Sequence, residues 1–300
     1  MKNSCCVVMG LLLVAAQAQA GQSGVDLLVK MNNALHHMNY SGTLVHIKGE
    51  DLNTLKIEHR VENGVEQEQV VSLNKEGKQI SRRERQTFSL SGIEQSIGMM
   101  KKVYSIDVGA TKTVADRTCQ VVIARPKDRK RYLQKYCLDT DSGLPLSYSL
   151  INNKRRSVER FTFTNVKVSV SEADNAADTA GAVMPPQMPM PEGEELGMGD
   201  KWHFTSLPKG FQFGSAPVSQ EAEMHRGADT EHFLLTDGLS SVSVFISPNI
   251  SDDMENPALI SSGALNVLTY QKSQHNVTLV GELPKATLQE MFNNLRYGSE

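Results

Sequence analysis

Between Tyr40 and Val170 the sequence consists of short runs rich in Val, Ile, Thr and aromatic residues, and this pattern constrains the fold more than any other feature. Clusters of turn-forming residues separate the runs at hairpin spacing, which predicts a large antiparallel sheet. The clusters are Gly49–Asp51, Glu62–Gly64, Lys75–Gly77, Asp141–Gly143 and Asn152–Asn153. The last run places Phe161 and Phe163 on one face and then shifts parity to Val166, Val168 and Val170. We therefore expect a β-bulge that bends a long strand.

Helical periodicity brackets the β-rich runs. Ser23 and Asp26 have the spacing of a capping box, and an apolar stripe at helical intervals follows them. The stripe comprises Leu27, Leu28, Met31, Leu35 and Met38. Near the end of the chain, Thr287 and Glu290 repeat the capping-box spacing, and a second stripe follows. That stripe comprises Leu288, Met291, Phe292 and Leu295. Both segments are expected to be helices that pack on sheets.

A linker divides the chain into two domains. Between Ser171 and Gly199 the patterning gives way to Ala, Asp, Glu, Met and Pro, with a Met/Pro tract at Met184–Pro191. Such a tract can bind copper through thioethers, but no histidines flank it, which favours a solvated spacer. We assign residues 21–170 to a first domain, 171–199 to the linker and 200–300 to a small α+β domain. Its strand-like runs are His232–Leu235, Ser241–Ile246, Ala264–Thr269 and Asn276–Val280.

The first twenty residues have the features of a signal peptide. Lys2 precedes an apolar run from Cys5 to Ala16, and the small-residue site Ala18–Ala20 closes it. The run is shorter than the ~20 residues of a membrane-spanning helix, and no later run reaches that length. Gly21–Ser23 follow the site, where a lipoprotein would need a cysteine. We expect a soluble, exported protein with no lipid anchor.

Cys119 and Cys137 are the cysteines that remain after signal removal, and an even count in an oxidising compartment favours a disulfide. If Cys119–Arg125 and Arg131–Cys137 are antiparallel strands around the turn Pro126–Lys130, pairing Arg125 with Arg131 places the two cysteines directly opposite each other. Opposed residues lie about 4.5 Å apart in a non-hydrogen-bonded pair, which suits a disulfide. A one-residue slip would separate them, and two buried free thiols are the alternative.

Motifs for catalysis and metal binding are absent from the sequence. It contains no G-x-S-x-G elbow, H-E-x-x-H helix, P-loop or dinucleotide fingerprint, so an enzyme and bound cofactors are not expected. His36 and His37 are adjacent on a predicted helix and point in different directions, so they cannot chelate one ion. The formal net charge of −3 gives no indication of a nucleic-acid partner.

One cationic cluster surrounds the predicted hairpin tip. Its members are Arg125, Lys127, Arg129, Lys130 and Arg131. Such a cluster is a candidate contact for phosphates on an anionic lipid. The alternative is a solvated turn whose charges discourage edge-to-edge pairing of strands.

Several segments, in order along both domains, resemble the RseB/MucB family. They are Leu27–Met31, Asn39–Val45 with its N-Y-x-G-T pattern, Ile57–Arg60, Pro126–Asp128, Arg131–Tyr132, Leu138–Leu146, Leu207–Phe211, Asp237–Ile246 and Val277–Pro284. The Leu138–Leu146 pattern also suits lipoprotein carriers of the LolA/LolB kind, but the ordered set is specific. The sequence departs from the family pattern at Glu66–Val70 and in its Met/Pro-rich linker.

The resemblance implies an α+β, mainly β fold: a large half-open antiparallel β-barrel similar to LolA/LolB, followed by the small domain. It also implies a periplasmic negative regulator of the sigma-E response. Such a protein binds the periplasmic part of the anti-sigma factor RseA, shields it from the protease DegS, and is released by lipopolysaccharide or lipoprotein acyl chains. A periplasmic lipid or lipoprotein carrier without a regulatory partner is the alternative function, and an envelope hydrolase is the third.

The resemblance also places much of the partner affinity in the small domain. The candidate partner-binding residues are Asp237, Gly238, Leu239, Ser243 and Phe245. We expect Asp237 and Gly238 to form a turn beside a strand whose Val242, Val244 and Ile246 face the core. Phe245 lies on the opposite, polar face, where it is either an anchor for the partner or packed under the C-terminal helix.

Overall fold

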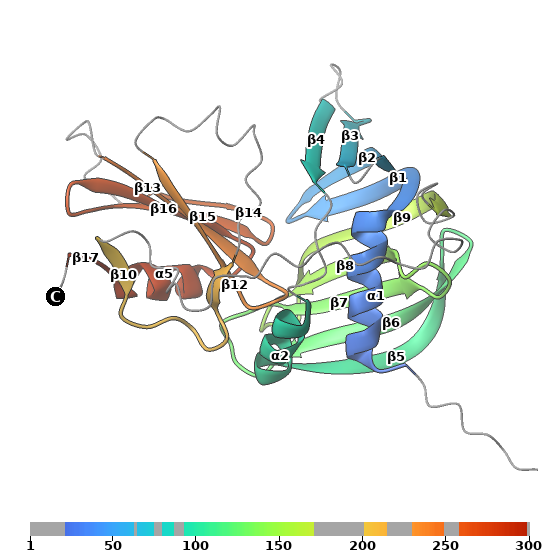
Figure 1. Cartoon of the computed structure of the whole chain (residues 1–300). Coiled ribbons are helices and arrows are strands. Elements are labelled where there is room, and N and C mark those ends of the chain that lie inside the picture. The colour runs from blue at the N-terminus through green and yellow to red at the C-terminus, as the bar shows by residue number, and fades with distance from the viewer. Residues whose placement is uncertain are drawn as a thin grey trace, which may run out of the picture.

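The computed structural model describes residues 22–62, 65–74, 80–86, 93–170, 201–214, 230–248 and 258–298. The predicted signal peptide and the whole of the predicted linker lie outside these ranges. Two sheets dominate the structure, and Figure 1 shows them side by side, with helices packed against the first and one described helix packed against the second.

The first sheet is antiparallel and curved, with nine strands in the order β4-β3-β2-β1-β9-β8-β7-β6-β5 (Figure 1). The strands are β1 Met38–Lys48, β2 Asp51–Glu62, β3 Val65–Ser72, β4 Ile80–Gln86, β5 Tyr104–Val114, β6 Arg117–Pro126, β7 Leu133–Asp139, β8 Pro145–Ile151 and β9 Ser157–Val170. Helix α1, Gly24–His37, begins at the predicted capping box of Ser23 and Asp26. Helix α2, Ile93–Val103, leads into β5.

Helix α1 lies across the sheet and supplies part of the first core. Its Leu27, Leu28 and Met31 pack with Val122 and Tyr136 of β6 and β7. The predicted bulge is confirmed: β9 pairs Asn165 with Thr43 but Phe163 with Leu44, which leaves Thr164 as the extra residue. This bulge produces the parity shift from the Phe positions to the Val positions in the sequence.

The structure contains the predicted disulfide between Cys119 and Cys137, but the strand register that led to it is wrong. Cys119 pairs with Asp139 and Cys137 with Val121, so the register is shifted by two residues. A shift of two keeps every side chain on its face, and the two cysteines remain close, with 5.2 Å between their Cα atoms. The turn is longer than predicted because the segment from Lys127 to Tyr132 contacts the rest of the protein rather than closing a tight hairpin.

The C-terminal domain is a six-stranded antiparallel sheet with one helix on one face (Figure 1). The sheet order is β11-β12-β13-β16-β15-β14, and β10 pairs separately with β17. The strands are β10 Trp202–Phe204, β11 Gln212–Gly214, β12 Glu231–Thr236, β13 Ser241–Pro248, β14 Ala258–Ser262, β15 Leu265–Lys272, β16 His275–Gly281 and β17 Leu295–Tyr297.

Helix α5, Lys285–Asn294, covers the core face of this sheet. Its Leu288, Met291 and Phe292 belong to the same core as Val242 and Val244 of β13. The helix starts two residues before the predicted cap, with Pro284 at the N-cap and no side-chain capping bond. The predicted capping box at Thr287 is therefore wrong. The Thr287 hydroxyl donates instead to the carbonyl of Lys130 in the first domain.

Candidate functional site

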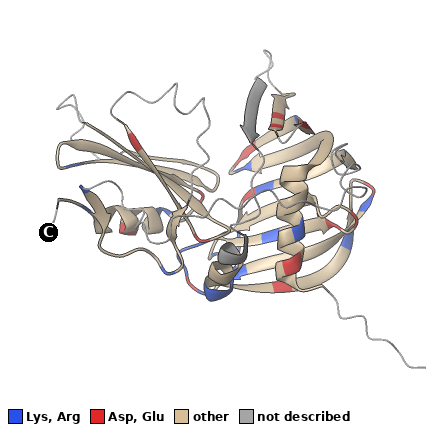
Figure 2. Cartoon of the chain, viewed as in Figure 1, with Lys and Arg blue, Asp and Glu red and all other residues tan. Residues whose placement is uncertain are grey.

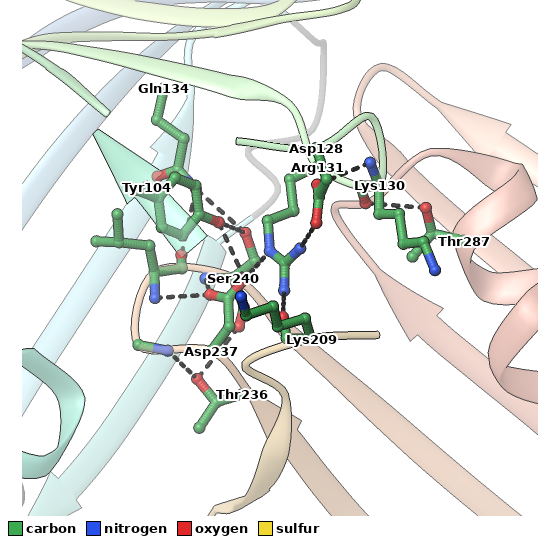
Figure 3. A network of polar contacts seen from close by, with 12 residues as sticks. Tyr104, Asp128, Lys130, Arg131, Gln134, Lys209, Thr236, Asp237, Ser240 and Thr287 are labelled. Atoms are coloured by element: carbon green, nitrogen blue, oxygen red, sulfur yellow. Dashed lines mark hydrogen bonds and ion pairs between the residues drawn. The ribbon is translucent and has the colours of Figure 1, made fainter. Parts of the chain in front are cut away.

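The long turn between β6 and β7 docks into the C-terminal domain (Figure 3). Arg131 is fully buried there, and its guanidinium forms an ion pair with the equally buried carboxylate of Asp237. Arg131 Nη2 also donates to the carbonyl of Lys209 at 2.5 Å. The Tyr104 hydroxyl donates to Asp237 Oδ2 at 3.0 Å and lies 3.1 Å from Ser240 Oγ. We call these five residues the polar latch, since they join the two domains.

Burial sets the electrostatics of the polar latch. Two charges removed from water are stable together only when they are well hydrogen-bonded. Burial lowers the pKa of Arg131, but the hydrogen bond and negative charge of Asp237 outweigh that effect and leave the pKa raised. Burial, reinforced by the charge of Asp237, raises the pKa of Tyr104. Arg131 therefore remains a cation and Tyr104 a neutral hydrogen-bond donor at ordinary pH.

The five predicted lipid-contacting cations divide into two groups. Those with exposed side chains are Arg125, Lys127 and Arg129. The other two hold the domains together, with Arg131 in the polar latch (Figure 3) and Lys130 paired with Glu290 of α5. The interpretation of Arg131 as a lipid contact is therefore wrong for this arrangement of the domains. The C-terminal domain thus contacts only the Lys130 and Arg131 side of the hairpin tip, which sequence spacing does not reveal.

A second polar contact joins the domains at the end of β1. His46 Nε2 lies 2.8 Å from Glu159 Oε1, and Glu159 Oε2 accepts a hydrogen bond from the Ala264 amide at 3.1 Å. Gly263 packs so closely here that a Cβ atom would lie 2.4 Å from Lys48 Cγ. Burial raises the pKa of Glu159, but hydrogen bonds from His46 and Ala264 outweigh it and leave the pKa lowered. An anionic Glu159 thus holds the β14–β15 turn against the first domain.

An apolar cavity of about 420 Å³ opens on the face of the first sheet that carries Leu35 of α1. The apolar lining includes Leu35, Leu44, Leu55, Ile57, Phe161 and Phe163. The polar side chains at its wall are His46 and Glu68. Its volume is within the roughly 300–1,000 Å³ typical of small-molecule sites, and its lining suits a hydrocarbon chain. We call it the apolar cavity.

A second cavity, of about 300 Å³, lies between the two domains. The first domain contributes Gln134, Tyr148 and Leu150 to its wall. The C-terminal domain contributes Leu239, Ser240, Ser241, Ser243, Leu265, Val280, Gly281 and Glu282. Hydroxyl, amide and carboxyl groups are thus more prominent here than in the apolar cavity. We call it the interdomain cavity.

The predicted partner-binding residues lie in three different environments: the polar latch, the interdomain cavity and the sheet face opposite α5. Asp237 and Gly238 form the expected turn before β13, in which Asp237 Oδ1 accepts from the amides of Leu239 and Ser240. Asp237 is buried in the polar latch, so a direct contact between it and a partner is excluded in this arrangement. Leu239 and Ser243 line the interdomain cavity.

Phe245 lies on the sheet face opposite α5. Val242, Val244 and Ile246 are buried in the core with that helix, as predicted, so strand alternation turns Phe245 away from it. The alternative that Phe245 packs under the helix is wrong. Its half-buried ring stacks on His232 at 4.4 Å between centroids. Figure 2 shows that the strands of this sheet carry few charged residues.

Sequence reasoning missed Tyr104, Glu159 and Glu282, which lie at the junction of the domains. No local motif identifies them, because each gains its role from residues more than 100 positions away or from the other domain. Within the described residues, no group of three or more His, Cys, Asp or Glu side chains is placed to hold a metal ion. Among the described helices, none is long and apolar enough to cross a membrane.

Relatives match over nearly the whole chain. The Escherichia coli K12 sigma-E factor regulatory protein RseB is 26% identical, covering 98% of this chain and 96% of the relative. The Pseudomonas aeruginosa sigma factor AlgU regulatory protein MucB is 25% identical, with 98% and 97% coverage.

Solved structures agree in fold. The Pseudomonas aeruginosa MucA/MucB complex matches with a TM-score of 0.64, 24% identity and coverage of 92% of this chain and 99% of that one. A crystal structure of MucB in complex with MucA(peri) matches with a TM-score of 0.63, 25% identity and coverage of 92% and 100%. The family model of the MucB/RseB N-terminal domain matches residues 23–188, and that of the MucB/RseB C-terminal domain matches residues 198–296. Both halves of the chain are thereby accounted for, and the protein belongs to the MucB/RseB family.

Proposed function

We propose that this protein is a periplasmic negative regulator of a sigma-E-type envelope stress response, which binds the periplasmic region of an anti-sigma factor. The observation that carries the proposal is the match over both domains to regulators named RseB and MucB. Solved structures of MucB with MucA support binding of an anti-sigma factor of that kind. In this function the bound protein shields the anti-sigma factor from a DegS-type protease.

The release signal in this proposal is a lipid, either lipopolysaccharide or a lipoprotein acyl chain. The apolar cavity supports this because aliphatic and aromatic side chains form most of its wall. Arg125, Lys127 and Arg129 remain candidate contacts for a phosphate, since their side chains are exposed. Regulation then requires that lipid and anti-sigma factor favour different states of the protein.

The anti-sigma factor binds the outer face of the C-terminal sheet, with Phe245 as an anchor. Strand register places Phe245 beside His232 on β12 and Thr278 on β16, and Thr278 beside Thr269 on β15. The imidazole of His232 is the one ionisable group in this row of four residues. Removing it from water on binding would carry little desolvation cost, and a stacked aromatic ring supplies apolar area.

The test is capture of partners from solubilised envelope by the mature protein and by Phe245→Ala. Tyr270→Ala is the matched control, because Tyr270 is also half-buried but stacks on Phe292 of α5. We expect the wild type and the control to retain an anti-sigma factor and Phe245→Ala to lose it while remaining folded. Equal capture by all three proteins would exclude Phe245 as the anchor. Recovery of lipids without any anti-sigma factor would instead select the carrier function.

A further inference from the structure

A row of aromatic side chains connects the interdomain cavity to the apolar cavity. Tyr148 lines the interdomain cavity, Phe161 lines the apolar cavity, and their ring centroids are 5.8 Å apart. The two residues are directly paired across β8 and β9. Their neighbours continue the row, with Tyr136 4.9 Å from Tyr148 and Phe163 6.2 Å from Phe161. This row of rings therefore spans the distance between the walls of the two cavities.

A carboxylate lines the interdomain cavity, and a lysine of the first domain lies at the neighbouring β14–β15 turn. Glu282 lines the cavity with an exposed side chain, and within the described part of the chain no salt bridge reaches it. Desolvation by the surrounding domains raises the pKa of Glu282, Glu159 raises it further, and Lys48 and His46 oppose the rise. Lys48 sits at the end of β1, where its side-chain stem packs against Gly263. The carboxylate of Glu282 at the cavity wall and the ammonium group of Lys48 at the turn that precedes the lining residue Leu265 thus come from opposite domains to the same joint.

Neutral hydrogen-bonding groups complete the wall. Ser241 and Ser243 of the C-terminal domain line the cavity, and Gln134 enters from the first domain. The amide of Gln134 is already oriented, because it donates to Ser240 Oγ at 3.2 Å and its carbonyl accepts from Tyr136. A head group with one cationic and one anionic part, and with oxygen atoms to hydrogen-bond, matches this combination.

We propose that the interdomain cavity binds the phosphoethanolamine head of a phospholipid or lysophospholipid whose acyl chain occupies the apolar cavity. The ammonium group pairs with Glu282, the phosphate lies towards Lys48, and the aromatic row contacts the first part of the chain. This inference rests on the acyl-chain binding proposed above and adds the head-group chemistry and the second binding compartment. The ligand contacts both domains, including Ser243 two residues before Phe245, and so connects the lipid site with the proposed partner surface.

The experiment compares binding of three single-chain ligands of equal length to the full mature protein. They are lysophosphatidylethanolamine, lysophosphatidylglycerol and a monoacylglycerol. The wild type should prefer lysophosphatidylethanolamine over lysophosphatidylglycerol by about tenfold, since charge-assisted hydrogen bonds are the stronger class. Glu282→Gln should remove that preference, whereas Lys48→Gln should weaken both phospholipids relative to the monoacylglycerol. Glu290→Gln is the matched control, because the Glu290 carboxylate pairs with Lys130 and does not line the cavity, and this variant should retain the preference.

The outcomes separate this inference from the function on which it rests. Binding of all three ligands to the wild type with equal affinity overturns the head-group site and leaves the acyl-chain site in place. A preference that survives in Glu282→Gln also overturns it, provided that the variant melts like the wild type. Failure of every ligand to bind overturns the acyl-chain site as well.

Discussion

Replacing Asp237 by Asn should open the joint between the two domains. The substitution is isosteric and retains Oδ1, which accepts the hydrogen bonds of the turn from Leu239 and Ser240. It removes the negative charge that faces Arg131 and puts an amide donor opposite a guanidinium donor. Tyr104 can still donate to Ser240 Oγ, 3.1 Å away. The variant therefore isolates the buried ion pair from the rest of the local structure.

The expected effect follows from burial. Both side chains of the pair are 0% exposed, and breaking a buried pair by removing one partner typically costs about 3–5 kcal/mol. Arg131 keeps Asp128 and the Lys209 carbonyl as partners, so we expect the lower end, about 3 kcal/mol. That free energy corresponds to a change of roughly 100-fold in the equilibrium between closed and open joint. Opening of the joint limits the loss of free energy, because water then solvates the unpaired Arg131 guanidinium.

Glu290→Gln provides the comparison within the same joint. The Lys130–Glu290 pair is 39% and 37% exposed, and such pairs contribute about 0–1 kcal/mol. Amide hydrogen exchange at Ala264 reports opening, since that amide of the C-terminal domain donates across the joint to Glu159 of the first domain. Small-angle scattering reports any increase in overall size. If Asp237→Asn exchanged no faster than Glu290→Gln and showed the same dimensions, the polar latch would not hold the domains together.

Three further predictions concern the first domain. The Cys119–Cys137 disulfide spans a sequence separation of 18, so its reduction should lower the free energy of unfolding by about 3 kcal/mol and the melting temperature by several degrees. An unchanged melting temperature in reductant would contradict this. Burial raises the pKa of Asp139, but hydrogen bonds from Arg117 and Ser142 outweigh burial and leave the pKa lowered. The stability that the Asp139 carboxylate contributes is therefore present above about pH 4 and is lost as pH falls through the folded-state pKa. Urea unfolding should therefore show that Asp139→Asn costs about 1–3 kcal/mol at neutral pH and much less near pH 2, and a pH-independent difference would refute the assignment. Gly143→Ala should destabilise the protein by more than about 1 kcal/mol, because Gly143 has a φ of +85° and a Cβ atom there would lie 2.7 Å from Lys30 Cγ. Gly98 has open space around it, so the control Gly98→Ala should not destabilise the protein.

Local chemistry explains what sequence alone predicted correctly. The parity shift after Phe163 predicted the β9 bulge, because side-chain alternation in a strand is set by the backbone itself. The same alternation predicted the core positions Val242, Val244 and Ile246. The Ser23 capping box was recognisable because its two partners are three residues apart. Family resemblance, carried by short segments in both domains, supplied the function that no catalytic motif could indicate.

Contacts between distant residues decided what sequence alone predicted wrongly. The β6–β7 register is shifted by two residues because a longer turn docks on the other domain, and hydrophobic alternation is insensitive to a shift of two. Thr287 has the spacing of a helix cap, yet it bonds to Lys130, more than 150 residues earlier. Arg131 and Asp237 have the composition of exposed turns and are both fully buried, since each neutralises the other across the domain joint. A pattern of neighbouring residues determines which face of a strand is apolar, whereas only the tertiary fold determines which charged turn is removed from water.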